Sequence, residues 1–405
     1  MKKNYIMGII ACAALTMTSC SNDEIGGNNT KQGDPIEFGV YLGRDAQSSR
    51  GTIITTENLT KFGVTAYLDM PDIPDFMYNQ EVTKSADGSW TYSPVKYWPT
   101  MEDGIHTNKA HSISFYAYAP HTSDANSLIT HSGNNDEHAA PTVTISLPTG
   151  TNADLAKMVD FVATAKHYEY KTNGNVVTFV LKHEMTRIDL KAKVSENVYG
   201  LTAANKTKVV IRSLKLKSGG EFYTKADYRF PQTNQAERGI WDNRTKATTD
   251  IDLQSILNWS GDWAISDKDI ISSTNQGIAL EGTSEVKLFN KNQYLFLIPS
   301  NKLDNEGKPA GLEANTTSAT ITYDIITEDS NLEDGYSKTS ATKTVYLPAG
   351  IMQQGKAYNL TFTIAVDQVK LDATVEPNWN TDTNSDIDVP YTPDDATPKP
   401  ATPKP

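Results

Sequence analysis

The chain has 405 residues, enough for two or three domains of roughly 100–200 residues each. Its 37 basic and 49 acidic side chains give a formal net charge of −12. A net-acidic chain lacks the positive surface that phosphate backbones require, so nucleic acid is excluded as an expected partner. Two cysteines can build neither a disulfide framework nor a Cys-rich zinc module.

Residues 1–19 have the layout of an export signal. Two lysines precede an apolar run from Ile6 to Met17, which is shorter than the roughly 20 residues that span a bilayer. The small residues before Cys20 resemble a bacterial lipobox, whose cysteine is acylated and becomes the mature N-terminus. The polar stretch after it resembles the leaders of surface-exposed Bacteroidetes lipoproteins. We expect a lipid on Cys20 to anchor the chain in the outer membrane, and a plain secreted protein is the alternative.

The body of the chain is patterned for strands, with a hydrophobic period of two. The first such segment places Ile36, Phe38, Val40 and Leu42 on one face. Further strands are expected at 62–68, 113–119, 161–165, 177–185, 188–194, 210–216, 294–298, 319–325, 358–366 and 369–375. The sequence therefore predicts an all-β protein whose stacked sheets bury one face of each strand.

Breaks in the pattern indicate where the strands turn. Turn dipeptides between alternating segments predict hairpins at Asp87-Gly88, Asn173-Gly174, Gly219-Gly220 and Asp334-Gly335. The alternation changes phase after Met185, which predicts a bulge or bend near Thr186-Arg187. Short helical turns are expected only within 153–159 and 252–259.

The domain organisation follows from polar stretches. One such stretch, from Glu196 to Lys206, divides the strand-rich body into halves at 36–200 and 201–380, each the size of a β-sandwich. The last residues, 381–405, are rich in Thr, Asp and Pro and end in a repeated Ala-Thr-Pro-Lys-Pro. Such a tail favours extended polyproline geometry and buries no core.

A search for catalytic chemistry is largely negative. The sequence has no Gly-rich phosphate loop, no H-E-x-x-H, no G-x-S-x-G and no candidate cysteine nucleophile. His183 and Glu184 are adjacent on a predicted strand and point to opposite faces, so His183 is interpreted as a core histidine with a satisfied hydrogen bond. We expect no enzyme and no cofactor, and a β-sandwich hydrolase is the weakest alternative.

Two clusters offer candidate binding sites. Five of the seven histidines lie between His106 and His138, in a polar segment that is typical of a solvated loop rather than a metal site. Trp259 and Trp263 flank Ser-Gly-Asp and could stack on sugars, although tryptophans more commonly close the edges of sandwiches. No metal site is predicted.

Several segments together resemble the fimbrillins, lipoprotein subunits of type V pili in Bacteroidetes. In chain order they are Cys20, IEFGVYLGRDAQSSRGTIIT, FGVTAYL, WTYSPVKYWP, ISFYAYAP, DFVATA, FVLKHEMTRIDLKAKV and LPAGIMQQGKAYNLTFTI. The resemblance implies two tandem transthyretin-like β-sandwiches. It also implies assembly with other pilus subunits by strand exchange, after an arginine-specific protease removes the first strand.

The sequence around the first strand is compatible with this processing. Residues 20–50 form an acylated leash plus a removable strand, and a cut after Arg50 and before Gly51 would release that strand. Arg44 is a rival cut site that directly adjoins the strand. Loss of the strand would leave an apolar groove with unpaired backbone groups, which is an acceptor for an added strand.

The C-terminus departs from what a good donor strand requires. Ile387, Val389 and Tyr391 lie on one face of a candidate donor, but Pro390 and Pro393 interrupt it, and proline donates no ladder hydrogen bond. This departure weakens the case for a main stalk subunit and leaves room for a tip, accessory or anchor position.

Two functions of different classes remain open. The leading hypothesis is a non-enzymatic fimbrial subunit or tip adhesin on the cell surface, which contacts a host or bacterial surface ligand. The alternative is a surface glycan-binding lipoprotein of a carbohydrate-uptake system, which would retain residues 21–50.

Overall fold

The computed structural model describes residues 34–42, 53–68, 76–98, 113–122, 128–132, 141–148, 154–164, 167–169, 176–196, 198, 207–231, 238–259, 277–280, 282–290, 293–300, 302, 310–365 and 368–376. Strands dominate these residues, which confirms the all-β prediction. Two 3-10 turns, Leu155–Lys157 (η2) and Gln254–Ile256 (η3), lie where helical turns are expected. In the described part of the chain, no helix has the length and apolar composition to span a membrane.

The largest sheet has eight strands in the order β1-β10-β8-β5-β2-β3-β4, with β9 beside β5. Its strands are β1 (Glu37–Leu42), β2 (Lys61–Leu68), β3 (Met77–Lys84), β4 (Trp90–Thr91), β5 (Ile113–Ala119), β8 (Val162–Ala163), β9 (His167–Glu169) and β10 (Val176–His183). A four-stranded sheet, β14-β13-β7-β6, contains β6 (Ile129–Ser132), β7 (Thr142–Ser146), β13 (Tyr223–Arg229) and β14 (Ile240–Lys246).

Two five-stranded sheets form the rest. One has the order β17-β11-β21-β22, with β18 beside β11, and contains β11 (Thr186–Val194), β17 (Val286–Lys287), β18 (Leu295–Leu297), β21 (Ala357–Ile364) and β22 (Val369–Glu376). The other has the order β15-β12-β19-β20, with β16 beside β12, and contains β12 (Thr207–Leu216), β15 (Ile251–Asp252), β16 (Ile278–Leu280), β19 (Ser318–Glu328) and β20 (Tyr336–Tyr346).

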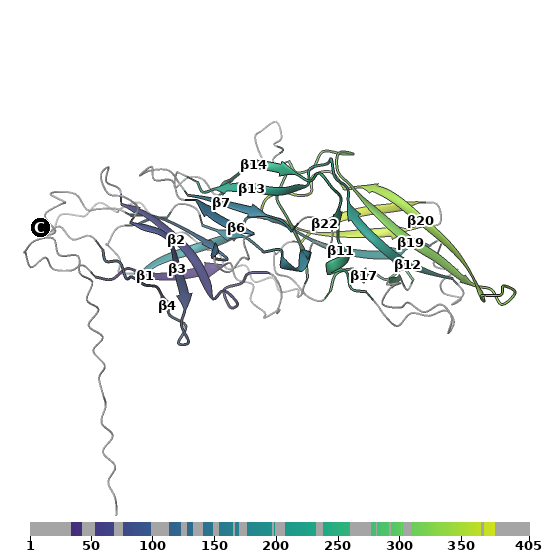
Figure 1. The fold of residues 1–405 in the computed structure, drawn as a ribbon, viewed down its shortest axis with the longest axis horizontal. Coiled ribbons are helices and arrows are strands. Elements are labelled where there is room, and N and C mark those ends of the chain that lie inside the picture. The colour runs from purple at the N-terminus through teal and green to yellow at the C-terminus, as the bar shows by residue number, and fades with distance from the viewer. Residues whose placement is uncertain are drawn as a thin grey trace, which may run out of the picture.

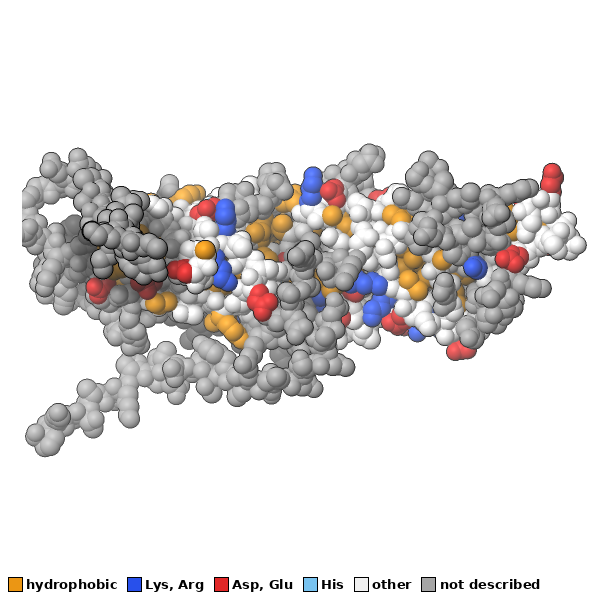
Figure 2. Space-filling view, turned by 90° about the horizontal axis from the view of Figure 1, so that it is seen from below, with side chains coloured by type: hydrophobic (Ala, Val, Ile, Leu, Met, Phe, Trp, Pro, Cys, Tyr) orange, Lys and Arg blue, Asp and Glu red, His pale blue; other side chains and the backbone are white. Residues whose placement is uncertain are grey.

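The sheets follow one another along an elongated molecule (Figure 1). The strands β1 to β4 lie toward one end, and the long β19–β20 hairpin extends to the other. On the described part of the face in Figure 2, apolar side chains are scattered among charged groups of both signs. This face therefore presents no large surface of a single charge.

Strand pairing does not follow the expected division at residue 200. β11 pairs in parallel with β21, so this part of the first half belongs to a sheet of the second half. Conversely, β13 and β14 of the second half belong to the same sheet as β6 and β7 of the first half, because β13 pairs with both β7 and β14. The polar stretch around residue 200 therefore does not mark where the sheets divide, because a local composition change does not report which distant strands pair.

The expected breaks in the strand pattern have different outcomes. The bulge or bend predicted near Thr186-Arg187 is a bend at Met185, between the end of β10 at His183 and the start of β11 at Thr186 in a different sheet. Gly219-Gly220 is not a hairpin, since β12 pairs with β15, β16 and β19, whereas β13 pairs with β7 and β14. Asp87-Gly88 and Asp334-Gly335 do join paired strands, β3–β4 and β19–β20. Asn173-Gly174 lies outside the described residues.

The eight-stranded sheet encloses a core of its own. β1, β2, β3, β5, β8 and β10 all contribute to one apolar cluster, although they belong to a single sheet. The sheet can do this because it coils until its two ends meet, where Pro35 bridges Tyr97. Its opposite face, which includes Tyr116 and Tyr118 of β5, packs into a second and larger cluster that extends into the other sheets.

Glu184 ties three segments together where the chain passes from β10 to β11. Its buried carboxylate accepts hydrogen bonds from Arg238 (3.1 Å) and Gln354 (2.6 Å), and Trp241 Nε1 donates to its backbone carbonyl at 3.0 Å. Burial raises the pKa of Glu184 to about 7, against the opposing effect of the Arg238 charge. The junction therefore depends on one desolvated carboxyl group.

Candidate functional site: the first strand and its groove

β1 lies at the edge of the eight-stranded sheet and pairs in parallel with β10 from Glu37–Val176 to Leu42–Leu181. The expected apolar face is observed. Ile36, Phe38 and Leu42 are 1%, 5% and 3% exposed, and Val40 is partly buried against the same cluster. The buried side chains of this edge strand therefore add to the backbone pairing with β10.

Phe38 lies among the other aromatic rings of this core. Its ring centroid is 5.1 Å from Tyr92, 5.6 Å from Phe179, 6.0 Å from Phe115 and 6.4 Å from Phe62. Most of these rings meet edge to face or tilted, which are favourable arrangements for aromatic pairs. Removal of β1 would therefore open the middle of the cluster and not merely its margin.

The segment after β4 holds the N-terminal end of β1. The backbone N–H of Ile36 donates to the carbonyl of Lys96, and the N–H of Trp98 donates to the carbonyl of Asp34, both at 2.9 Å. The hydroxyl of Tyr92 donates to the carbonyl of Ile36 at 2.9 Å. The WTYSPVKYWP segment thus has a structural role against β1 that its sequence alone did not reveal.

The other end of β1 is held by residues 53–56. Thr56 Oγ1 accepts a hydrogen bond from the N–H of Leu42 at 3.0 Å and donates to its carbonyl at 2.9 Å. The neighbouring Ile54 N–H donates to buried Asp160 at 2.8 Å, and His183 Nδ1 lies 2.9 Å from the same carboxylate. Ile54 therefore has an anchor, Asp160, that does not belong to β1.

These contacts set the free energy needed to remove β1. Full burial of one large apolar side chain stabilises a fold by about 1.5–3 kcal/mol, so Ile36, Phe38 and Leu42 together contribute about 5–9 kcal/mol. A typical domain is stable by only about 5–15 kcal/mol. An empty groove would therefore be strongly unfavourable, and β1 is expected to leave only when another apolar strand replaces it.

Several predicted site residues lie outside the described residues. They are Cys20, Arg44, Arg50, Gly51, Trp263, Ile387, Val389 and Tyr391. His183 is half-buried and bonded to Asp160, which agrees with its interpretation as a satisfied core histidine. Trp259 is partly buried against the core and donates from Nε1 to the carbonyl of Gln254 at 3.0 Å, which agrees with the commoner role of a tryptophan at the edge of a sandwich.

Two histidines of the predicted solvated loop are instead part of the fold. His121 is 7% exposed, and His131 lies in β6 with its ring stacked on Tyr118 at 5.9 Å. Burial, with a smaller effect of the His121 charge, lowers the pKa of His131 to about 4. The loop prediction is wrong for this pair because the aromatic face of β5 supplies a surface on which the rings stack.

His106, His111 and His138 lie outside the described residues. Among the residues that the structure describes, no group of three or more His, Cys, Asp or Glu side chains could hold a metal ion.

The family model described as fimbrillin-like matches residues 49–379. The chain belongs to the fimbrillin-like family. This match agrees with the resemblance carried by the segments from FGVTAYL to LPAGIMQQGKAYNLTFTI. The family match begins at residue 49, after β1. The evidence for the apolar face of β1 is therefore the sequence and the structure of this chain.

One solved structure has a similar fold. The crystal structure of a fimbrial protein from Bacteroides vulgatus has a TM-score of 0.64 and 24% identity, and the alignment covers 84% of this chain and 98% of that chain. A fimbrial assembly protein from Parabacteroides distasonis aligns over 86% of this chain and all of that chain, at 12% identity and a TM-score of 0.32. No curated protein matches the sequence.

Proposed function

We propose that this fimbrillin-like chain is a non-enzymatic structural or adhesive subunit of a cell-surface fimbria, joined to other subunits by exchange of β1. The observation that carries the proposal is the position of β1. It is an edge strand, yet it places Phe38 among the aromatic rings of a core. Such a strand can be replaced by another strand of the same pattern without changing the rest of the sheet.

Export and anchoring precede assembly in this proposal. The signal peptide of residues 1–19 directs the chain out of the cytoplasm, and a lipid on Cys20 attaches it to the outer membrane, exposed at the surface. An arginine-specific protease then cuts after Arg50. Because β1 precedes this cut and Thr56 and Ile54 follow it, cleavage would leave β1 bound only by noncovalent contacts.

The replacing strand comes from another subunit. The main chain of β10 would pair with it, and the pockets left by Ile36, Phe38 and Leu42 would fix its register. In the candidate donor of this chain, Ile387, Val389 and Tyr391 supply an alternating face that Pro390 interrupts. This favours a tip or accessory position over a stalk position.

The domain organisation of the proposal is two tandem transthyretin-like sandwiches with exchanged strands. The eight-stranded sheet and β14-β13-β7-β6 form the first sandwich, and the two five-stranded sheets form the second. β11 thus joins the second sandwich, while β13 and β14 return to the first. This arrangement is supported by the strand pairing and replaces the division at residue 200.

Blots and N-terminal sequencing of the surface-assembled protein test the proposal. Arg50→Ala should leave a lipidated, unpolymerised precursor, whereas the wild-type assembled chain should begin at Gly51. Arg44→Ala is the matched control and should polymerise normally. Normal ladders from Arg50→Ala would reject this cut site. An assembled chain that still begins at acylated Cys20 would instead support the glycan-binding lipoprotein.

A further inference from the structure

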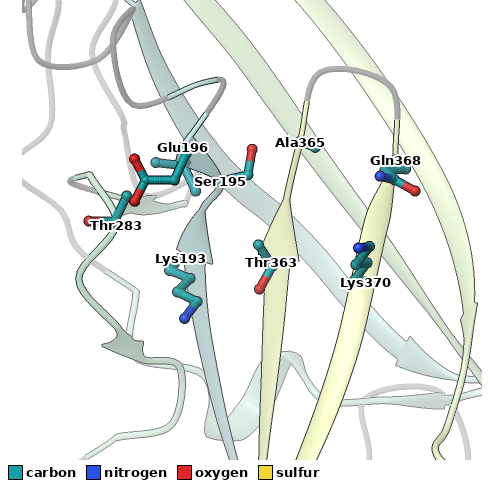
Figure 3. A pocket seen from close by; sticks show the side chains of 9 residues that line it. Lys193, Ser195, Glu196, Thr283, Thr363, Ala365, Gln368 and Lys370 are labelled. Carbon is teal, nitrogen blue, oxygen red and sulfur yellow. The ribbon is translucent and has the colours of Figure 1, made fainter.

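A pocket of about 450 Å³ lies beside the ends of β11 and β21 and the start of β22 (Figure 3). Its lining contains hydrogen-bonding side chains from all three strands and from the residues beside them, chiefly Lys193, Ser195, Glu196, Thr363, Gln368 and Lys370. The volume is within the range of small-molecule sites, which is roughly 300–1,000 Å³. None of the residues that line it is aromatic.

The floor of the pocket is fixed by strand register. Lys193 of β11 lies opposite Thr363 of β21, and Thr363 lies opposite Lys370 of β22, so the three side chains form one row on the same face. With neighbouring strands about 4.8 Å apart, the two lysine backbones are about 10 Å apart across the threonine. A ligand seated over Thr363 is within reach of both ammonium groups.

The charge of the pocket differs from that of the whole chain. Among the residues that line it, Lys193 and Lys370 are positive and Glu196 is negative, in a chain whose net charge is −12. Glu285, which is not part of the lining, forms ion pairs with both Lys191 Nζ (3.5 Å) and Lys193 Nζ (3.9 Å). Lys370 is exposed, and none of the ion pairs found among the described residues involves it.

We propose that this pocket binds an acidic sugar, with its carboxylate between Lys193 and Lys370. Charge-assisted hydrogen bonds from the two ammonium groups would hold the carboxylate. The hydroxyls of the sugar would bond to Thr363, Gln368 and Glu196, since a carboxylate accepts from hydroxyl groups and an amide both donates and accepts. A neutral sugar would use only this second set of contacts.

An acidic sugar would be the ligand of the adhesive subunit proposed above, so its biological role depends on that proposed function. Binding of a sugar to the purified chain requires neither cleavage at Arg50 nor strand exchange. If assembly tests fail and sugar binding succeeds, the proposed function is wrong and the pocket remains a site. The opposite outcome removes the pocket alone.

The test measures binding of the purified full chain to polyacrylamide carrying D-glucuronate, with polyacrylamide carrying D-glucose as the neutral probe. Binding to glucuronate should be at least about tenfold tighter than to glucose, since one charged hydrogen bond is worth about 1.5–3 kcal/mol. Lys370→Glu should abolish this preference, and Lys370→Arg should restore most of it. Lys225→Glu, on an exposed position of β13, is the matched control and should change nothing.

Three outcomes would overturn the inference. Glucuronate could bind no more tightly than glucose, or Lys370→Glu could bind as wild type. Alternatively, Lys225→Glu could lose as much binding as Lys370→Glu, which would reveal nonspecific attraction to the net charge of the probe. Circular dichroism of each variant checks that the fold is intact, and the exposure of Lys370 and Lys225 makes an intact fold the expected result.

Discussion

β1 and β22 are both edge strands with a single neighbour on the sheet path, yet they are attached in opposite ways. β22 continues from β21 through a short turn and pairs with it in antiparallel fashion from Ile364–Val369 to Ala357–Glu376. β1 pairs with β10, which lies far along the chain. β22 therefore stays beside its neighbour through local connectivity, whereas β1 stays through its buried side chains.

The burial of the two strands shows what each contributes. Three residues at β1, Ile36, Phe38 and Leu42, are buried, but each residue of β22 is half-buried or exposed. In the proposed function, one cut after Arg50 would separate β1, which is remote in sequence from β10, and its departure would leave a specific apolar groove. A strand in a tight hairpin offers neither property.

The same substitution in both strands tests this contrast most strongly. Leu42→Ala should lower the free energy of unfolding by about 2–5 kcal/mol, as expected for a fully buried leucine. Leu371→Ala in β22 should cost less than half as much, because Leu371 is only partly buried. Urea unfolding of both variants measures the difference.

Tyr41→Ala serves as the control within β1, since Tyr41 is 41% exposed. It should change stability by less than about 0.5 kcal/mol. If Leu42→Ala and Leu371→Ala cost the same, burial does not distinguish the two edge strands, and the argument for a replaceable β1 loses its energetic basis.

A second experiment concerns Glu184, which lies between β10, the neighbour of β1, and β11, which belongs to the sheet that contains β22. Its pKa is about 7 in the folded chain, against 4.5 for a glutamate that is free in water. The folded state therefore retains a proton that the unfolded state releases between these values, so the free energy of unfolding should fall as pH rises from 4.5 to 7. Glu184→Gln should remove this part of the slope, which unfolding at several pH values would measure.

Arg238→Met tests whether the pH dependence comes from Glu184. The substitution leaves the Glu184 carboxyl without its cation, which should raise the pKa of Glu184 further. The free energy of unfolding should then continue to fall at higher pH. His131 contributes the opposite trend, because its lowered pKa removes stability as pH falls from 6.5 to 4. Only the difference between wild type and Glu184→Gln isolates the carboxyl, and an unchanged slope would contradict its assignment.

The smallest expected effect concerns the end of β1. Thr56→Val removes both hydrogen bonds to Leu42 while keeping the shape of the side chain, which should cost about 1 kcal/mol. Hydrogen exchange should show faster exchange of the Leu42 amide. Thr322→Val, which removes a hydroxyl contact to Thr342 in the β19–β20 hairpin, should leave β1 unaffected. Equal protection of Leu42 in wild type and Thr56→Val would show that this end of β1 is held by other contacts.

Sequence patterns predict strands where apolar residues recur with a period of two. β10 and β21 also alternate in burial, whereas β2 and β5, which the same period predicts, are buried on both faces. β20 was missed, because its segment YSKTSATKTVY is exposed or half-buried along its length. Its strand is formed by eleven backbone pairs with β19, from Ser318–Tyr346 to Glu328–Tyr336, and pairing of this kind leaves no hydrophobic period in the sequence.

The candidate site shows the same division. The apolar face of β1 could be predicted from Ile36, Phe38, Val40 and Leu42. The partners of this face could not, since Tyr92 and Trp98 follow β4 and reach β1 only because the two ends of the sheet meet. His121 and His131 were assigned to a loop because nothing in their polar surroundings indicates that β5 presents Tyr118 to them.

The sequence by itself determined an all-β chain, a first strand with one apolar face and the resemblance that the family match confirmed. Composition and alternation are local properties, and they suffice for these conclusions. Only the tertiary structure decided that β11 pairs with β21, from the second half of the chain, and that β13 pairs with β7, from the first half. It also decided that β1 fills the centre of an aromatic core, because strand pairing depends on contacts between segments that lie far apart in the chain.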